Sequence, residues 1–212
     1  LIRMVSDAWT VARGRATVSQ SSGLKLAMLI VCGSVPTACI GIGLGGLMES
    51  LTLDLGVICG ALVVNAMVLF YLGHLQARPD QPGRTLEELT LRDALIIGTI
   101  QGLAVFRGIS RSGSTITAAM VCGLNRQAAA TFSFLLSIPA IAGALLLEFD
   151  LDAFQSQHVG LYLLGGAVAC ISGTAALLGL LRLLEGGRLH LFGWYCLFIA
   201  ALGMFWRFGS IA

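Results

Sequence analysis

The chain has 212 residues, of which 57% are hydrophobic and only 11% are charged, and its mean hydropathy is +0.88. A soluble domain of ordinary composition carries about 25% charged residues, so the composition excludes that class and indicates an integral membrane protein. The formal net charge of +2, from 13 basic and 11 acidic residues, excludes a general nucleic-acid binder.

Five apolar stretches are long enough to cross a bilayer as helices, because about 20 apolar residues suffice. They lie at 24–48, 54–73, 128–148, 160–184 and 191–208. The expected fold is an all-α integral membrane protein, a helical bundle that forms a single membrane domain over residues 1–212. Small residues four apart, Gly41 with Gly45 and Gly56 with Gly60, predict close helix contacts in the first two spans.

Segment 93–124 does not fit a simple crossing. Its first apolar stretch, Ala94 to Phe106, is too short to span, and a polar cluster separates it from a second short stretch, Ile116 to Leu124. Irregular backbone at membrane depth is tolerated where it is buried in protein or lines a cavity. We therefore expect about five transmembrane helices plus one re-entrant helical hairpin.

The distribution of Lys and Arg supports this topology, because basic residues accumulate in cytoplasmic loops. Basic residues occur in or beside four segments that we expect on the cytoplasmic side: 1–23, 74–92, 125–127 and 185–190. All four reach that side only if segment 93–124 enters and leaves the membrane on the same side.

Residues 107–115 read Arg-Gly-Ile-Ser-Arg-Ser-Gly-Ser-Thr, in the middle of this apolar chain. An arginine at membrane depth costs about 2.5–3.5 kcal/mol on the insertion scale, so such a cluster usually lines a cavity or binds an anion. Gly108 and Gly113 allow the backbone to approach a ligand closely. The side-chain chemistry of the cluster suits a phosphate group.

We expect Ser112 or Ser114 to cap a helix that begins near Thr115. The free N–H groups of its first turn attract an anion, and the planar guanidinium of Arg111 can hold two phosphate oxygens at once. The alternative is that Arg111 pairs with a buried acid and the serines only cap the helix. Hydroxyl groups along the cluster, including that of Ser110, add further donors.

The other potentially reactive side chains are not expected to take part in catalysis. The three histidines fall in loops or at span ends, and the acids near residue 150 are expected in a solvated loop: His74, His158, His190, Glu148, Asp150 and Asp152. The six cysteines show no paired spacing and are expected to be small buried hydrophobic residues. A membrane carrier or flippase for a lipid phosphate or another anion is the rival to an enzyme, because re-entrant hairpins also build carriers.

The run from Gln101 to Thr115, Gln-Gly-Leu-Ala-Val-Phe-Arg-Gly-Ile-Ser-Arg-Ser-Gly-Ser-Thr, resembles the second signature of the undecaprenyl-diphosphate phosphatase family, the bacitracin-resistance phosphatases. The run from Phe132 to Pro139 is similar to the family's following helix. The resemblance implies a multi-pass enzyme of the bacterial inner membrane. Such an enzyme hydrolyses undecaprenyl diphosphate to the monophosphate that carries peptidoglycan precursors.

Carried across by position, the resemblance implies that Arg111, Ser110 and Thr115 bind phosphate or act in catalysis. The positions it implies for substrate binding are Gly108, Ser112, Gly113, Ser114 and Gln101. It also implies an inverted repeat, with 24–73 as the end of the first repeat and 93–208 as the second. The implied partners are an isoprenoid diphosphate lipid and membrane lipids, without nucleic acid, and a homodimer is left open.

This sequence departs from the family pattern in two respects. Arg107 stands where the family has Pro, and the family's first signature, Glu-x-x-x-Glu followed by Ser-Ser-x-Gly-His, is expected upstream of Leu1. The corresponding acidic positions of the visible repeat hold Gln101 and Val105. The resemblance therefore implies that carboxylates for acid–base work, or for a divalent cation (Mg²⁺ or Ca²⁺), lie in a missing N-terminal part and that the chain as given is inactive without them.

Overall fold

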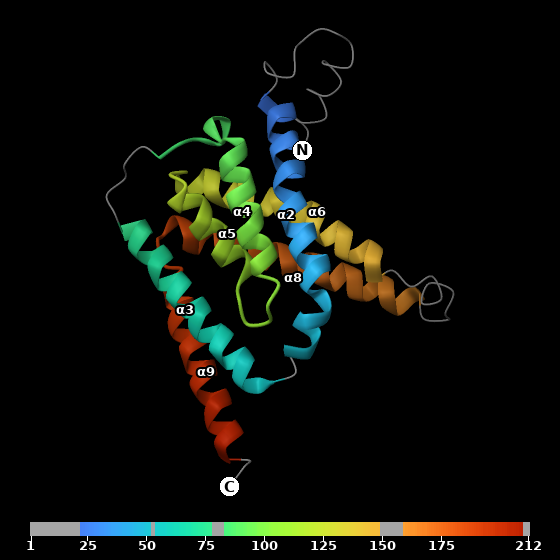
Figure 1. Ribbon diagram of the computed structural model, residues 1–212, viewed down its shortest axis with the longest axis vertical. Coiled ribbons are helices and arrows are strands. Elements are labelled where there is room, and N and C mark those ends of the chain that lie inside the picture. The colour runs from blue at the N-terminus through green and yellow to red at the C-terminus, as the bar shows by residue number, and fades with distance from the viewer. Residues whose placement is uncertain (1–21, 52–53, 78–82, 149–158, 210–212) are drawn as a thin grey trace.

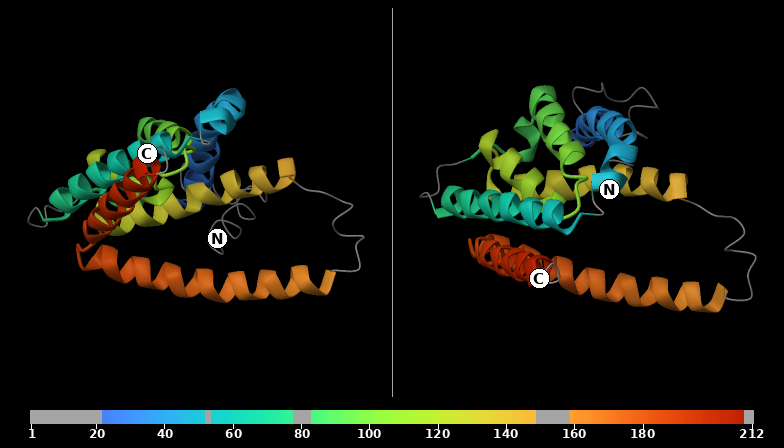
Figure 2. Two further views of the ribbon diagram at one scale, coloured as in Figure 1. Left: turned by 90° about the horizontal axis from the view of Figure 1, so that it is seen from below. Right: turned by 60° about the horizontal axis from the view of Figure 1, so that its bottom comes forward.

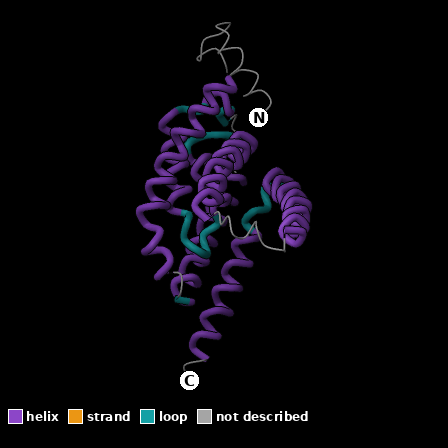
Figure 3. The backbone as a smooth tube through the Cα atoms, turned by 90° about the vertical axis from the view of Figure 1, so that its right-hand side faces the viewer, coloured by secondary structure: helices purple, strands orange, loops and turns teal. Residues whose placement is uncertain are grey.

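The computed structural model describes residues 22–51, 54–77, 83–148 and 159–209, and the regular structure of these residues is helical (Figure 1 and Figure 3). The long helices are α2 (Ser22–Leu51), α3 (Leu55–Ala77), α6 (Arg126–Glu148), α8 (Val159–Glu185) and α9 (Leu191–Gly209). Two shorter helices, α4 (Leu91–Leu103) and α5 (Arg111–Val121), follow a single 3-10 turn, η2 (Leu86–Glu88).

The five predicted spans are confirmed in number and position. Within the described residues, five helices are long and apolar enough to cross a membrane: Gly23–Leu44, Leu55–Ala77, Arg126–Leu146, Gly160–Leu184 and Leu191–Gly209. Each agrees with its expected range to within a few residues at either end. The chain is thus a multi-pass membrane protein. The division into two repeats stays a prediction.

The expected hairpin is also present, formed by α4 and α5 with a loop between them. It occupies the centre of the bundle, with α2 packed along α4, α3 along α5, and α6 against both α2 and α5 (Figure 1). At 1.5 Å per residue, the 13 residues of α4 rise only about 20 Å. This is less than the roughly 30 Å of a hydrocarbon core. We call the loop of residues 104–110 the hairpin tip.

The two ends of the hairpin meet at one end of the bundle, which we call the hairpin base. The backbone N–H of Arg84 donates to the carbonyl of Gly123 at 2.9 Å, and that of Asn125 donates to the carbonyl of Arg84 at 3.0 Å. The Arg84 side chain donates to the carbonyl of Cys122 and pairs with Asp93, where Nη2 and Oδ2 are 3.0 Å apart. Entry and exit therefore lie side by side, as the charge distribution predicts.

Described residues in or beside the basic segments gather at this same end. Lys25 donates to the carbonyl of Glu87 at 2.6 Å, and Arg126 donates to the carbonyl of Gln76. The turn before α9 also lies there, because a Cβ at Gly187 would meet Gln76. At the opposite end Arg207 pairs with Asp54 at 2.7 Å, so that arginine is neutralised locally. Which side is cytoplasmic stays a prediction.

A close backbone contact between two helices lies outside the predicted small-residue pairs. Atoms built at Gly41 or Gly60 would meet nothing within 4 Å. Instead, α2 and α4 touch at Gly33 and Gly98, where an added Cβ on Gly98 would overlap the carbonyl oxygen of Gly33. Thr37 fastens this contact, since its hydroxyl donates to the Gly98 carbonyl at 2.7 Å. Of the glycines predicted from spacing, Gly41 and Gly60 face no neighbour, whereas a Cβ at Gly56 would overlap the Arg207 side chain of α9.

Helix α8 stands apart from the rest of the bundle (Figure 2). Every residue from 160 to 178 is exposed, and contact with α6 is slight. The expectation of buried cysteines holds for Cys59 and Cys196 but is wrong for Cys39 and Cys170, which are exposed on apolar helices. Exposed apolar residues of such helices face lipid at no cost, so apolar character does not imply burial.

Candidate functional site

The hairpin tip turns through Gly108. The N–H of Ile109 donates to the carbonyl of Phe106 at 3.1 Å, and Gly108 has a φ of +101°. That conformation is rarely adopted by other residues. A Cβ there would also lie 3.0 Å from the carbonyl oxygen of Ile58 on α3. Glycine at this position therefore serves both the turn and the close approach of the tip to α3.

Ser110 caps helix α5. It is in an extended conformation, and its Oγ accepts a hydrogen bond from the N–H of Gly113 at 3.1 Å. The expectation that Ser112 or Ser114 caps a helix beginning near Thr115 is thus wrong by about one turn. The polar first turn Arg-Ser-Gly-Ser hides the start of the helix from a hydrophobic pattern, although Ser110 is a favourable N-cap.

Asn65 holds the cap in place from a neighbouring helix. It lies in the middle of α3, is 3% exposed, and its Oδ1 accepts the backbone N–H of Ser110 at 2.8 Å. Its Nδ2 in turn contacts Sγ of Cys196 on α9 at 3.2 Å. Sequence reasoning missed this residue. A lone amide inside an apolar span was the available signal, because buried polar groups in membranes need a partner.

Arg111 begins α5 at the tip and is exposed. Among the described residues it makes no ion pair, so the alternative in which it pairs with a buried acid is not what the structure shows; Asp93 pairs with Arg84 instead. The backbone N–H groups of Arg111 and Ser112 likewise have no partner in the described part of the chain. A guanidinium and two free N–H groups at a helix N-terminus together favour an anion.

Thr115 and Gln101 lie inside the bundle rather than at the tip surface. Both are 1% exposed. The Thr115 hydroxyl donates to the carbonyl of Arg111 at 3.0 Å, which ties it to the first turn of α5. Gln101 Nε2 donates to the carbonyl of Leu136 at 3.3 Å and contacts Thr37, so it links α4 to α6 and α2. Their expected roles toward phosphate stay predictions.

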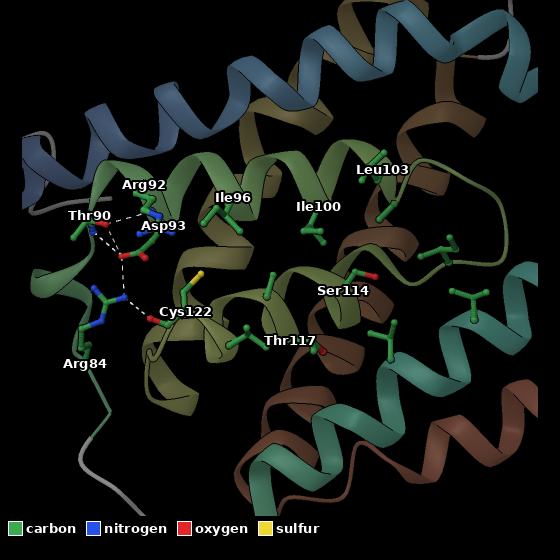
Figure 4. Close-up of a pocket in the computed structure, with 16 residues that line it drawn as sticks. Arg84, Thr90, Arg92, Asp93, Ile96, Ile100, Leu103, Ser114, Thr117 and Cys122 are labelled. Atoms are coloured by element: carbon green, nitrogen blue, oxygen red, sulfur yellow. Dashed lines mark hydrogen bonds and ion pairs between the residues drawn. The ribbon is translucent and has the colours of Figure 1, made fainter.

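Gly113 and Ser114 continue the first turn of α5 and are both buried. Gly113 packs against Leu69 of α3, where an added Cβ would come within 3.1 Å of the Leu69 side chain. Ser114 faces a groove that runs along the hairpin (Figure 4). The structure thus brings Ser110, Arg111 and Ser112 together at the tip, and places Ser114 one turn inward.

The groove has a volume of about 910 Å³ and is bounded by α3, α4 and α5. Its walls are mostly aliphatic, with the hydroxyls of Ser114 and Thr117 among them (Figure 4). Thr117 donates its hydroxyl to the carbonyl of Gly113 at 2.7 Å, so that group is already satisfied. One end of the groove reaches the tip at Ile109, and the other reaches the charged hairpin base.

Electrostatics at the base hold the two ends of the hairpin together. The hydrogen bond with Asp93 raises the pKa of Arg84 above its ordinary value. Partial burial acts to raise the pKa of Asp93, which lies outside the five spans, but hydrogen bonds from Arg84 and Thr90 outweigh it and the net pKa is lowered. Hydrogen bonds from the backbone N–H and hydroxyl of Thr85 lower the pKa of Glu88. All three groups are thus held in their charged forms.

The described residues do not offer a site for a divalent cation. No three His, Cys, Asp or Glu side chains of this part of the chain come together. His74 and His190 lie at span ends, whereas His158, Asp150 and Asp152 fall outside the described residues. The tip itself, residues 104–110, contains no acidic side chain and no histidine. The tip therefore supplies positive charge and hydrogen-bond donors.

These features define a polytopic membrane protein with a polar, anion-attracting turn at the tip of a re-entrant hairpin. Comparison with known proteins identifies the family, because residues 1–202 match that of the bacitracin resistance protein BacA. The chain belongs to this family. The hairpin signature from Gln101 to Thr115, on which the resemblance was noted, lies within the matched region.

Curated relatives agree with this assignment. An undecaprenyl-diphosphatase of Desulfatibacillum aliphaticivorans is 40% identical over 195 residues, covering 89% of this chain and 69% of the relative. One of Desulforapulum autotrophicum is 38% identical over 195 residues, covering 92% of this chain and 69% of the relative. One of Desulfosudis oleivorans is 43% identical over 185 residues, covering 86% and 65% respectively.

Proposed function

We propose that this protein hydrolyses undecaprenyl diphosphate to undecaprenyl phosphate and inorganic phosphate, and so returns the lipid carrier to cell-wall synthesis in a bacterial inner membrane. The family and the names of its relatives support the reaction. The observation that carries the site assignment is the guanidinium of Arg111 beside two N–H groups at the start of α5, none of which has a partner among the described residues. Bacitracin resistance follows from the same activity.

In this proposal the hairpin tip binds the terminal phosphoryl group. Phosphoryl transfer is catalysed chiefly by positioning and by stabilising the charge that develops on the transferred group. Arg111 would contact two phosphoryl oxygens, and the N–H groups of Arg111 and Ser112 would hold a third. Asn65 fixes the backbone at Ser110, so these donors keep one geometry. The nucleophile, a hydroxyl or an activated water, stays open.

A divalent cation, Mg²⁺ or Ca²⁺, remains part of the proposal through the family resemblance alone. The described residues do not bring three metal-ligating side chains together, so its ligands would come from outside this part of the chain. Chelation by EDTA, followed by titration of each cation back into the assay, tests the requirement. A homodimer likewise stays a prediction, which the mass of the detergent-solubilised protein tests.

The site is tested by release of phosphate from undecaprenyl diphosphate in detergent, comparing the full-length wild-type protein with its Arg111→Ala variant. Loss of one charged donor to the transferred group should lower kcat by about 10²–10³. Arg188→Ala is the matched control, because Arg188 is also an exposed arginine but lies in the turn before α9. Normal turnover by the Arg111→Ala variant would mean that the hairpin tip takes no part in the reaction.

The same preparations distinguish the enzyme from a carrier. Wild-type protein in proteoliposomes is given the diphosphate lipid, and both phosphate release and movement of lipid between leaflets are measured. Hydrolysis without lipid movement is expected. Lipid movement without hydrolysis would establish the rival function, in which the same Arg and Ser side chains hold an anion during transport.

A further inference from the structure

The groove along the hairpin has a definite length and an uneven lining. Along α4 it extends from Arg92 to Leu103, which corresponds to roughly 16 Å of helix at 1.5 Å per residue. Ile96 and Ile100 are among the aliphatic residues on its walls (Figure 4). Val64 of α3 is another. Apart from the Ser114 and Thr117 hydroxyls, its polar side chains are confined to the end at the hairpin base. Most of its length therefore suits a hydrocarbon chain.

The groove is continuous with the anion site. Ala104 and Ile109 of the tip line its inner end. On α5, Arg111 precedes Ser114 by three residues and Ala118 by seven, so all three share one side of the helix. A ligand whose charged group contacts Arg111 would therefore find the apolar walls within one helical turn.

The other end of the groove is closed to hydrocarbon by charge. Arg92 is exposed there, and Arg84 and Asp93 form their ion pair across the hairpin base. An apolar chain that starts at the tip gains nothing by passing these groups. It would leave the groove sideways, between α3 and α4, into the surrounding lipid.

We propose that this groove binds the first isoprene units of the substrate's hydrocarbon tail while the diphosphate lies at the hairpin tip. This inference rests on the proposed function and adds the site for the lipid portion of the substrate. An extended chain advances about 1.2 Å per backbone bond, as a polypeptide does, so a four-bond isoprene unit occupies about 5 Å. The groove therefore accommodates about three units, and the rest of a long chain lies in the bilayer.

The experiment is a chain-length series in detergent, in which the full-length protein is given C5, C15 and C55 isoprenoid diphosphates. For wild type, kcat/KM should rise at least about tenfold from C5 to C15 and then change little from C15 to C55, because the additional units lie outside the groove. A rise that continues evenly to C55, or the absence of any dependence on chain length, would overturn the proposal.

A matched pair of variants tests whether the dependence of kcat/KM on chain length arises in the groove. Ile96→Trp obstructs the groove seven residues from the end of α4, about 10 Å from the tip. Ile171→Trp makes the same change on α8, where Ile171 is 73% exposed and far from the groove. Ile96 is 39% exposed, so folding should tolerate the larger side chain, and size-exclusion profiles check this.

Ile96→Trp should lower kcat/KM for C15 and C55 about tenfold and leave C5 within twofold of wild type, whereas Ile171→Trp should match wild type throughout. An equal loss for all three substrates, or none for any, would mean that the groove does not hold the hydrocarbon tail, and the proposal would be wrong. Full-length wild-type protein that hydrolyses no substrate at all would instead contradict the proposed function.

Discussion

The α4–α5 hairpin and helix α8 are built from opposite kinds of sequence and lie in opposite surroundings. The hairpin carries buried hydroxyl side chains such as Thr115 and Thr117, which donate to carbonyl groups of their own helix. Helix α8 is apolar, yet residues 160–178 are all exposed. In a bilayer the surrounding lipid solvates apolar side chains, so polar groups are drawn inward and apolar ones need no cover. In this protein the buried residues are therefore those that are polar or that pack closely, and apolar character alone does not predict burial.

The largest difference between the two regions should be in thermal stability, when a glycine of each region is replaced by alanine. Gly98→Ala inserts a Cβ into the backbone of Gly33, which cannot move aside without separating α2 from α4. Overpacking of this kind costs about 1–3 kcal/mol and more where backbone is involved. We expect poor yield and a strongly lowered Tm in detergent.

Gly173→Ala on α8 is the matched change, because a Cβ there meets nothing within 4 Å. Its Tm should be unchanged or slightly raised, since alanine favours a helix more than glycine does. Similar Tm values for the two variants would show that the contact of α2 with α4 does not limit stability.

The second prediction compares the two side-chain contacts of Asn65, one with Ser110 and one with Cys196. Asn65→Leu leaves the backbone N–H of Ser110 without its acceptor, and a buried donor left unpaired costs about 1–3 kcal/mol. The tip should lose its fixed geometry, and kcat should fall roughly ten- to hundredfold. Phosphate release at saturating substrate measures this loss.

Cys196→Ala provides the comparison, because it removes only the weak contact of a thiol with the other end of the same amide. Turnover should stay within about threefold of wild type, in line with the small energy of such contacts. Equal losses in the two variants would indicate that α3 and α9 have separated, and that Asn65 has no particular role at the tip.

The smallest effect concerns pH at the hairpin base. Asp93 has a folded-state pKa below its ordinary value of 3.8. The stability it contributes is therefore complete above pH 3.8 and is lost as the pH falls through the lower, folded-state value. Asp93→Asn should lower Tm modestly at pH 7, by the equivalent of about 1 kcal/mol for a partly exposed pair.

The difference in Tm between wild type and Asp93→Asn should diminish in a titration that continues below pH 3.8. Fluorescence-monitored melting between pH 7 and pH 3 measures it. A difference that stays constant across this range would mean that the carboxylate charge of Asp93 contributes nothing to the base of the hairpin.

The sequence predicted the large features because they depend on single, simple quantities. Length and apolar composition identify the five spans, and the shortness of the stretch before Arg107 identifies the hairpin. The cap was misplaced because Ser110 and the polar turn after it interrupt the apolar pattern that marked the helix. Asn65 was missed because its partner is 45 residues away, and such a pairing depends on how the helices pack.

Arg84 and Leu124 lie side by side at the hairpin base, and this has a consequence for the two ends of the described chain. Because the segment between Arg84 and Leu124 returns to the membrane surface from which it started, it does not add to the number of membrane crossings. Five crossings then separate Ser22 from Gly209 by one full bilayer. A membrane-impermeant thiol reagent added to one compartment should therefore label a cysteine introduced at Ser22 and spare one introduced at Gly209, or the reverse.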